Sequence, residues 1–407
     1  MNAKNRVRRF GLPDAMPAGA AVLIGAASGL SQVNFAFFFL LPLAWFMSQS
    51  RLAAFLAVLA YYMTVSSGII AGTRLYFSLG AGFEAARYLL LLWCGTSLSL
   101  SAPWALLWTG SDSSALSKTF RIVVILVLVT VPPLGLWGWA NPLLCAGFLM
   151  PNAGIAGIVI IPAIWIALWH CRERHPRAFR AALFPLVLYA AFMSPMSRHE
   201  VKKPENWEGI NTSFGRLYSG SDDSISPFLR YQFLSVILEK SPAKYAVLPE
   251  TVSGWWGRTT EALWQPTTDL FRSRGKTYFT GAETTKAGTK KYYNVVQIRG
   301  ANNDTVVQRF PVPFSMWKPW SDDGAVADWF GSNGIVTIDG MSVGLLICFE
   351  PYLYFPFLVT MLNGPDIIVV VSNSWWSRTT NLPAMSDKCA ASWSILFGTP
   401  LVLSKNI

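Results

Sequence analysis

The sequence predicts a membrane α-helical bundle followed by an α/β domain. Residues 1–197 hold almost all of the apolar weight, in about seven stretches that approach the ~20 residues needed to span a bilayer. Residues 198–407 have the composition of a globular domain in which short apolar runs alternate with helical spacing. Because 52% of the chain is hydrophobic and only 14% is charged, an ordinary soluble protein is excluded.

The apolar stretches set the predicted order of spans in the first half. They cover residues 18–31, 33–48, 52–71, 88–109, 121–140, 153–170 and 181–196. The first two are short and break around Ser31 and Gln32, so they form either a tilted hairpin or one kinked span.

Basic residues predict the orientation of these spans. They gather before the first stretch at Lys4, Arg6, Arg8 and Arg9, and then at Arg51, at Lys118 and Arg121, and at Arg172, Arg174, Arg177 and Arg180. With seven spans the positive-inside rule puts all four groups in the cytoplasm. We therefore expect a multi-pass bacterial inner-membrane protein with a periplasmic C-terminal domain. If the first two stretches form one span, the number of spans is no longer odd and this assignment of sides fails. The last basic group still favours a periplasmic C-terminal domain.

The net charge of +11 has a sufficient explanation in this membrane arrangement. Basic residues beside a bilayer attract anionic lipid head groups. Nucleic-acid binding needs a basic face with interleaved aromatic residues in the soluble part, so it is not expected. Tryptophans are dense in the second half, where they either line an acyl pocket, dip into the lipid interface or fill the core: Trp255, Trp256, Trp317, Trp320, Trp375 and Trp376.

The second half divides into recognisable elements. Apolar residues at helical spacing predict helices over 228–240 and 384–396. Apolar runs predict strands at 245–248, 343–347, 366–372 and 401–403, and a Gly-Ala-Asn-Asn-Asp turn predicts a hairpin within 297–307. Strands that alternate with helices indicate a layered α/β domain.

Cys348 is the first candidate catalytic residue. The strand at 343–347 runs directly into Cys348, Phe349, Glu350 and a proline that cannot continue a ladder. A nucleophile at the end of a strand is held rigidly, although a free cysteine in an apolar run is more often a small core residue. No histidine follows His199, so a Cys-His dyad and a His-bearing zinc site are not expected in this domain. No metal or cofactor is predicted, and the base must be a carboxylate.

Glu250 is the candidate base. The strand at 245–248 ends on Pro249 and Glu250, which predicts that Glu250 and Cys348 lie at the same edge of one sheet. Cys389 shares the domain, and an oxidising compartment permits a disulfide between the two cysteines. We do not favour that pairing, because it blocks the nucleophile.

These motifs resemble the nitrilase superfamily, whose catalytic residues are Glu, Lys and Cys, and within it the membrane branch, apolipoprotein N-acyltransferase. Leu248–Thr251 and Ile347–Glu350 match its first and last motifs, and further matches are Thr280–Ala282, Tyr293 with Asn294, and Val371–Trp376. The resemblance implies an α-β-β-α sandwich. It also implies an acyl thioester on Cys348, with Glu250 as base, a membrane phospholipid as acyl donor and the N-terminal cysteine of a lipoprotein as acceptor.

The sequence departs from the family at the lysine motif. With one residue deleted, Arg309 takes the place of the lysine; counted without a gap from Val312, Pro313 and Phe314, the residue is Gln308. We assign Arg309 as the catalytic cation, together with Cys348, Glu250 and Glu350, although an arginine cannot readily lose a proton. Lys318 is close enough in sequence to reach the site, although the spacing does not require it. The family's loop glutamate is Met316, and the chain ends at Ile407, short of the family's last strands and span.

The arginine, the Ser-Met-Trp-Lys-Pro-Trp stretch and the early end resemble short relatives of the acyltransferase that are encoded in the transfer regions of agrobacterial and rhizobial plasmids. Three functions therefore stay open. The first is a membrane-bound acyltransferase that acts in conjugal transfer, on a lipoprotein or a component of the transfer apparatus. The second is a hydrolase of small amides. The third is a catalytically impaired membrane partner of the conjugation apparatus.

Overall fold

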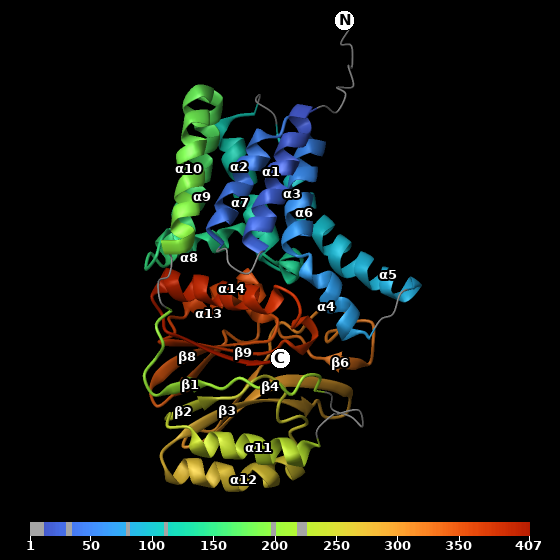
Figure 1. The fold of residues 1–407 in the computed structure, drawn as a ribbon, viewed down its shortest axis with the longest axis vertical. Helices are drawn as coiled ribbons and strands as arrows, with labels where there is room; N and C mark the ends of the chain where they lie inside the picture. Colours follow the sequence, from blue (N-terminus) through green and yellow to red (C-terminus); the bar gives the residue numbers. More distant parts are fainter. Residues whose placement is uncertain (1–11, 30–34, 79–81, 110–112, 197–200, 218–225) are drawn as a thin grey trace, which may run out of the picture.

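The computed structural model describes residues 12–29, 35–78, 82–109, 113–196, 201–217 and 226–407. Figure 1 shows two parts stacked along the long axis: a bundle of helices, and an α/β domain below it. We call residues 12–196 the helical half and residues 201–407 the α/β domain.

The helical half consists of helices of very different lengths, several of them short or interrupted. They are α1 (Leu12–Gly29), η1 (Phe35–Leu40), α2 (Leu41–Met47), α3 (Arg51–Val65), α4 (Gly68–Tyr76), α5 (Phe83–Leu89), the π-helical η2 (Leu90–Gly95), α6 (Thr96–Leu106), α7 (Ala115–Thr130), η3 (Leu134–Trp137), η4 (Pro142–Leu144), α8 (Cys145–Leu149), α9 (Ile155–Arg174) and α10 (Pro176–Met196).

Among the described residues, two helices are long and apolar enough to cross a bilayer, Ala86–Leu106 and Ile155–Arg174. A third is gained if α3 and α4 form one span with a bend of 51°. The predicted span at 121–140 is not one helix: α7 ends at Thr130, because Pro132 and Pro133 follow and a residue before proline is driven out of the helical region. The N-terminal basic group and the break at Ser31 and Gln32 lie outside the described residues, so the seven-span topology stays a prediction.

The α/β domain contains two sheets of mixed direction. The first has the order β1-β2-β3-β4-β5, with β6 also paired to β4, and the second has the order β10-β9-β8-β7. Their strands are β1 (Trp207–Gly209), β2 (Tyr245–Val247), β3 (Thr277–Thr285), β4 (Lys290–Gly300), β5 (Asp304–Val307), β6 (Asp323–Ala325), β7 (Ile335–Ile338), β8 (Met341–Ile347), β9 (Ile367–Asn373) and β10 (Leu401–Asn406). The helices are α11 (Pro227–Lys240), α12 (Arg258–Ser273), η5 (Glu350–Tyr352), α13 (Tyr354–Leu362), η6 (Trp375–Ser377) and α14 (Leu382–Phe397).

Alternation of side chains along the strands builds a four-layer sandwich. Val247 and Phe279 of the first sheet share a buried cluster with Leu345 and Val369 of the second, so these faces pack on each other. The other face of the first sheet packs on α11 and α12, and the other face of the second packs on α13 and α14. Figure 1 shows this α-β-β-α order, as the sequence resemblance implies.

The elements expected from the sequence in this domain are confirmed. The predicted helices correspond to α11 and α14, and the predicted strands to β2, β8, β9 and β10. The hairpin predicted within 297–307 is the β4-β5 pair, in which Ile298 lies opposite Asp304.

The helical half and the α/β domain share one apolar core. Helix α14 packs on the short helix α8, where Ser392 Oγ donates to the Leu144 carbonyl oxygen at 2.6 Å. A Cβ atom on Gly147 would overlap the Ser392 backbone, so only glycine permits this approach. On another side, Gly72 of α4 lies against the ring of Trp376 in η6.

Candidate active site

Cys348 lies where strand β8 ends, in a strained conformation. Its φ angle is 58°, a left-handed value that is uncommon for a residue with a Cβ atom. The Cys348 N–H donates to the Val371 carbonyl oxygen at 2.8 Å, which fixes this turn to the neighbouring strand β9. Strain of this kind is concentrated at functional sites. Both Cys348 and Cys389 are free thiols, in agreement with the expectation that they are not paired.

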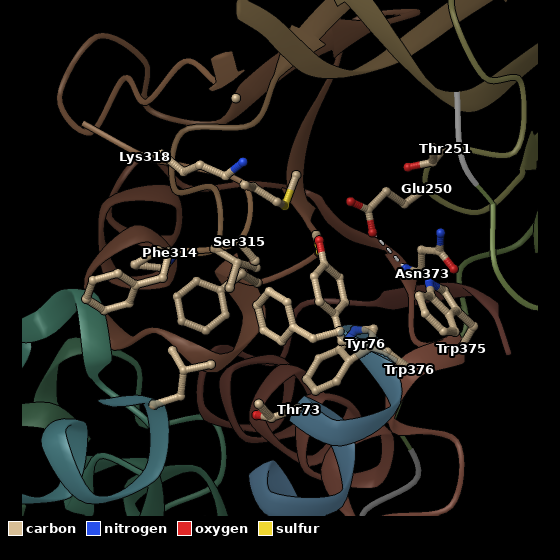
Figure 2. Close-up of a pocket in the computed structure, with 18 of the residues that line it drawn as sticks. Thr73, Tyr76, Glu250, Thr251, Phe314, Ser315, Lys318, Asn373, Trp375 and Trp376 are labelled. Carbon is tan, nitrogen blue, oxygen red and sulfur yellow. Dashed lines mark hydrogen bonds between the residues drawn. The ribbon is translucent and has the colours of Figure 1, made fainter. Parts of the chain in front are cut away.

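Glu250 follows strand β2 and faces Cys348 from the other sheet. The two residues therefore do not share a sheet edge as predicted, because β2 belongs to the first sheet and β8 to the second. The sandwich brings the two sheets face to face, and the Cys348 thiol and the Glu250 carboxylate lie close enough that each changes the pKa of the other. Glu250 is 3% exposed. Its Oε1 accepts from Asn294 Nδ2 at 2.6 Å, and its Oε2 accepts from the Asn373 N–H at 2.7 Å, the bond drawn in Figure 2.

Gly281 in the central strand β3 allows the backbone of Glu250 to sit this close. A Cβ atom at Gly281 would overlap backbone atoms of Pro249, Glu250 and Thr251. The Gly281 N–H also donates to the Pro249 carbonyl oxygen at 3.0 Å. The Thr-Gly motif is therefore a packing requirement of the loop that carries the candidate base.

Burial keeps a proton in the site. It raises the pKa of Glu250 to about 7, although the nearby Cys348 thiol and the hydrogen bonds from Asn294 and the Asn373 N–H oppose the change. Enclosure and the adjacent Glu250 charge also raise the pKa of Cys348. The resting pair thus shares a proton that Glu250 can take when the thiol attacks.

Gln308, the residue that an ungapped count matches to the family's lysine, lies beside Asn294 and Glu250. Its Oε1 accepts from Asn294 Nδ2 at 2.9 Å, so one asparagine amide joins Gln308 to the Glu250 carboxylate. Its Nε2 donates to the Ile347 carbonyl oxygen at 3.0 Å and to the Phe310 carbonyl oxygen at 3.2 Å. Both N–H groups of the Gln308 amide are therefore occupied by main-chain carbonyls.

Arg309 and Glu350 form a separate buried pair. Glu350 Oε1 accepts from the Arg309 N–H at 2.6 Å and lies 3.4 Å from Arg309 Nε, while Arg309 Nη2 donates to Thr360 Oγ1 at 3.1 Å. Glu350 Oε2 accepts from the Ile347 N–H at 3.0 Å. Neither side chain lines the cavity at Cys348. The structure thus brings Cys348 and Glu250 together and places Arg309 and Glu350 where they brace the turn after β8.

A cavity of about 690 Å³ opens over Cys348 and Glu250 and is lined by both halves of the chain. Its apolar wall includes Ile69, Tyr76, Phe77, Tyr88, Leu92, Trp137 and Trp139 from the helical half, and Trp255, Tyr292, Phe314, Phe349, Trp375 and Trp376 from the α/β domain. Figure 2 shows aromatic rings gathered below Glu250, beside the helix that carries Thr73 and Tyr76. Charged residues also line it: Arg216, Glu283, Lys290, Lys318 and Asp323. No cluster of potential metal ligands occurs among the described residues.

Sequence reasoning named some of these groups without their roles. Asn294 and Asn373 lie inside motifs quoted for the resemblance, and Gln308 was the alternative to Arg309. The cavity wall supplied by the helical half was missed, since apolar residues there are indistinguishable in sequence from a lipid-facing surface.

No protein-family model matches this chain. Its sequence is 32% identical over 376 residues, 90% of each chain, to a protein of Sinorhizobium fredii named "Probable conjugal transfer protein TraB". The chain belongs to the TraB family of conjugal transfer proteins. A second TraB, "Conjugal transfer protein TraB" of Agrobacterium fabrum, is 30% identical over 382 residues, which cover 90% of this chain and 86% of that one.

Solved structures similar to this TraB family member include an amidase and a carbon-nitrogen hydrolase. An amidase of the nitrilase superfamily from Nesterenkonia matches with a TM-score of 0.33 and 10% identity over 49% of this chain and 74% of its own. A carbon-nitrogen hydrolase from Helicobacter pylori matches with a TM-score of 0.35 and 14% identity over 44% of this chain and 69% of its own.

Proposed function

We propose that this TraB family member is a membrane-bound acyltransferase-like enzyme of plasmid conjugal transfer. The observation that carries the proposal is that Cys348 and Glu250 lie together in the lining of a cavity whose walls come from both halves of the chain. The catalytic domain faces the periplasm and the helical half lies in the inner membrane. The apolar helices and the conjugal transfer relatives support this placement.

The first step forms an acyl-enzyme. Glu250 takes the thiol proton, and the Cys348 sulfur attacks the ester carbonyl of a phospholipid, whose carbonyl electrons move onto its oxygen. When the tetrahedral intermediate collapses, the carbon-oxygen bond to glycerol breaks, and the leaving alkoxide takes the proton from Glu250. The products are a Cys348 thioester and a lysophospholipid.

An amine then collects the acyl group from the thioester. It attacks the thioester carbonyl, loses a proton through Glu250 and leaves an amide and the free thiol. The acceptor is an amino group of a lipoprotein or of a component of the transfer apparatus. The aromatic lining favours an acyl chain over a small soluble amide, because apolar walls gain energy by removing an apolar chain from water.

The test is intact-mass analysis of the purified full-length protein after incubation with phospholipid vesicles. We expect a fatty-acyl mass increment that hydroxylamine removes, and none on Cys348→Ser. In a donor strain, Cys348→Ala should reduce plasmid transfer while the protein remains in the membrane. Full transfer by that variant would contradict the proposal.

A second candidate, a non-catalytic membrane partner, is favoured by Gln308, which leaves the position beside Glu250 without a positive charge. It predicts that a Cys348→Ala and Glu250→Gln double variant supports transfer like the parent protein. Deletion of residues 198–407 should then abolish transfer, which separates a role of the domain from a role of its chemistry.

A further inference from the structure

Acylation of Cys348 requires a partner for the negative charge that develops on the substrate oxygen. A cation or free N–H group at that point is among the largest contributions to such a reaction. Gln308 cannot supply it, since its amide is neutral and both N–H groups bind the carbonyl oxygens of Ile347 and Phe310. Arg309 cannot supply it either, since its guanidinium is buried against Glu350 and Thr360, away from the cavity.

Three cationic side chains line the cavity among the described residues: Arg216, Lys290 and Lys318. The Arg216 guanidinium lies 5.3 Å from the Trp375 ring centroid and donates to Ser78 Oγ at 2.8 Å, so its position is fixed at the rim. Lys290 begins strand β4, opposite Asp323 of strand β6, and is exposed, whereas Lys318 is half-buried and therefore more enclosed by the cavity.

The Lys318 side chain is held more loosely than that of Arg216, and it extends toward the side of the cavity on which Glu250 lies (Figure 2). Its ammonium is 3.4 Å from Asp323 Oδ2, with the lysine side chain 32% exposed, so the ion pair is weak and the side chain is free to turn. Figure 2 shows Lys318 extending from its loop toward the side of the cavity on which Glu250 lies.

The loop that carries Lys318 is firmly anchored. The Phe314 N–H donates to the Trp317 carbonyl oxygen at 3.0 Å, and the Ala325 N–H donates to the Met316 carbonyl oxygen at 2.7 Å. Phe314 also stacks on Trp137 of the helical half, with ring centroids 5.4 Å apart. A fixed backbone with a long flexible side chain is suited to deliver an ammonium when substrate arrives.

We propose that Lys318 supplies the catalytic cation that stabilises the oxyanion during acylation of Cys348, in place of the residue at position 308. The inference rests on the proposed acyltransferase function. As the carbonyl electrons move onto oxygen, the Lys318 ammonium leaves Asp323 and donates to that oxygen, keeping its own proton throughout. It returns to Asp323 once the thioester forms and the alcohol departs.

The test measures acylation of the purified full-length protein in detergent micelles by p-nitrophenyl octanoate. Release of p-nitrophenol gives the rate, and intact mass locates the adduct on Cys348. Lys318→Met keeps the apolar stem and should lower the rate about 100-fold, the loss typical of removing one oxyanion donor. Lys318→Arg should stay within about tenfold of the parent.

A relocated lysine separates this role from a structural one. In the Lys318→Met background, Gln308→Lys should restore the acylation rate at least tenfold, because it returns a cation to the same oxygen from the strand side. Lys291→Ala is the matched control, since Lys291 neighbours Lys290 but does not line the cavity. Acylation rates are compared only between variants whose thermal unfolding matches that of the parent protein.

Two outcomes contradict the inference in different ways. If Lys318→Met acylates at the parental rate while Cys348→Ser does not acylate, Lys318 is not the catalytic cation and the proposed function stands. If the parent forms no adduct at all, both the proposed function and the role of Lys318 fail.

Discussion

At the scale of single residues, Gln308 leaves the position next to Glu250 without a positive charge. With a neutral amide next to Glu250, the Cys348 thiolate has no fixed positive partner from the strand, so enclosure and the Glu250 charge keep the pKa of the thiol high. We predict that Gln308→Lys raises the rate of Cys348 alkylation by iodoacetamide about tenfold at pH 7, because a nearby cation stabilises the thiolate. Gln308→Leu, which adds no charge, should not accelerate the reaction, and equal rates for both variants would contradict the prediction.

Glu250 should set the pH dependence of acylation. Burial raises the pKa of this carboxyl from 4.5 to about 7, so below that pH it carries a proton and cannot accept another from the thiol. The acylation rate should therefore increase as pH rises from 5 through 7. In Glu250→Gln the rate should be at least about 100-fold lower, and the inflection near pH 7 should disappear. Stopped-flow measurement of p-nitrophenol release between pH 5 and 8.5 checks both; an unchanged inflection in the variant would assign it to another group.

The sequence located Cys348 and Glu250 but left the lysine position open, and the reason lies in strand geometry. Successive residues in an extended chain face opposite sides, so a one-residue slip exchanges the two faces. Gln308 faces Asn294 and Glu250, whereas Arg309 faces Glu350. A one-residue gap in the alignment therefore exchanges Gln308 for Arg309 at the family's lysine position. Only the packing of the two sheets shows which of them lies beside Glu250. A site role for Glu350 stays a prediction, whereas the buried position of Arg309, outside the cavity lining, argues against the role of catalytic cation predicted for it.

At the scale of elements, strand β3 supports the loop that carries Glu250. We predict that Gly281→Ala displaces this loop, because the added Cβ atom overlaps the backbone of Pro249, Glu250 and Thr251. The variant should lose about 1–3 kcal/mol of stability, the usual cost of overpacking, and most of its acylation rate. Gly257→Ala is the control, since a Cβ atom there meets nothing within 4 Å. Denaturant unfolding and p-nitrophenol release measure the two effects; parental values for Gly281→Ala would contradict the prediction.

The π-helical segment η2 should limit the length of the acyl chain. Leu92 of η2 lines the helical side of the cavity, and π-helical turns are frequent at functional sites. We predict that Leu92→Trp lowers acylation by p-nitrophenyl palmitate about tenfold, while acylation by p-nitrophenyl butyrate stays within about twofold. Leu98→Trp, at an exposed position of α6, is the control. An equal loss with both esters would assign the effect to folding instead of chain length.

Elements were easier to predict in the α/β domain than in the helical half. Strands such as β9, with its continuous run of Ile and Val, are defined by local pattern and end at recognisable turns. In the helical half the breaks between helices fall inside continuous apolar stretches. Hydropathy alone therefore predicted one span across α3 and α4, and another that extends past the prolines after α7. The π-helical turn between α5 and α6 has no signal in the sequence, because it depends on packing.

At the scale of the whole molecule, the site is complete only where the two halves meet. The segment that contains Trp376 in η6 packs on helix α4, and three residues earlier the Asn373 N–H holds the Glu250 carboxylate. Movement of the helical half therefore reaches the candidate base through one short segment. The cavity at Cys348 has the same dependence, since its lining includes Leu92 and Trp137 of the helical half as well as Phe349 and Trp375 of the α/β domain.

We predict that loosening the contact between the halves affects long acyl chains more than the thiol itself. Gly147→Leu places a side chain where the Ser392 backbone lies, so α8 and α14 must separate. The cavity then loses part of its helical wall, and acylation by phospholipid vesicles should fall at least tenfold. Alkylation of Cys348 by iodoacetamide should stay within about threefold, because the thiol, Glu250 and their hydrogen bonds belong to the two sheets. Gly19→Leu, in helix α1 where a Cβ atom meets nothing within 4 Å, is the control. If both reactions fall together, the two halves fold as one unit and the site does not survive their separation.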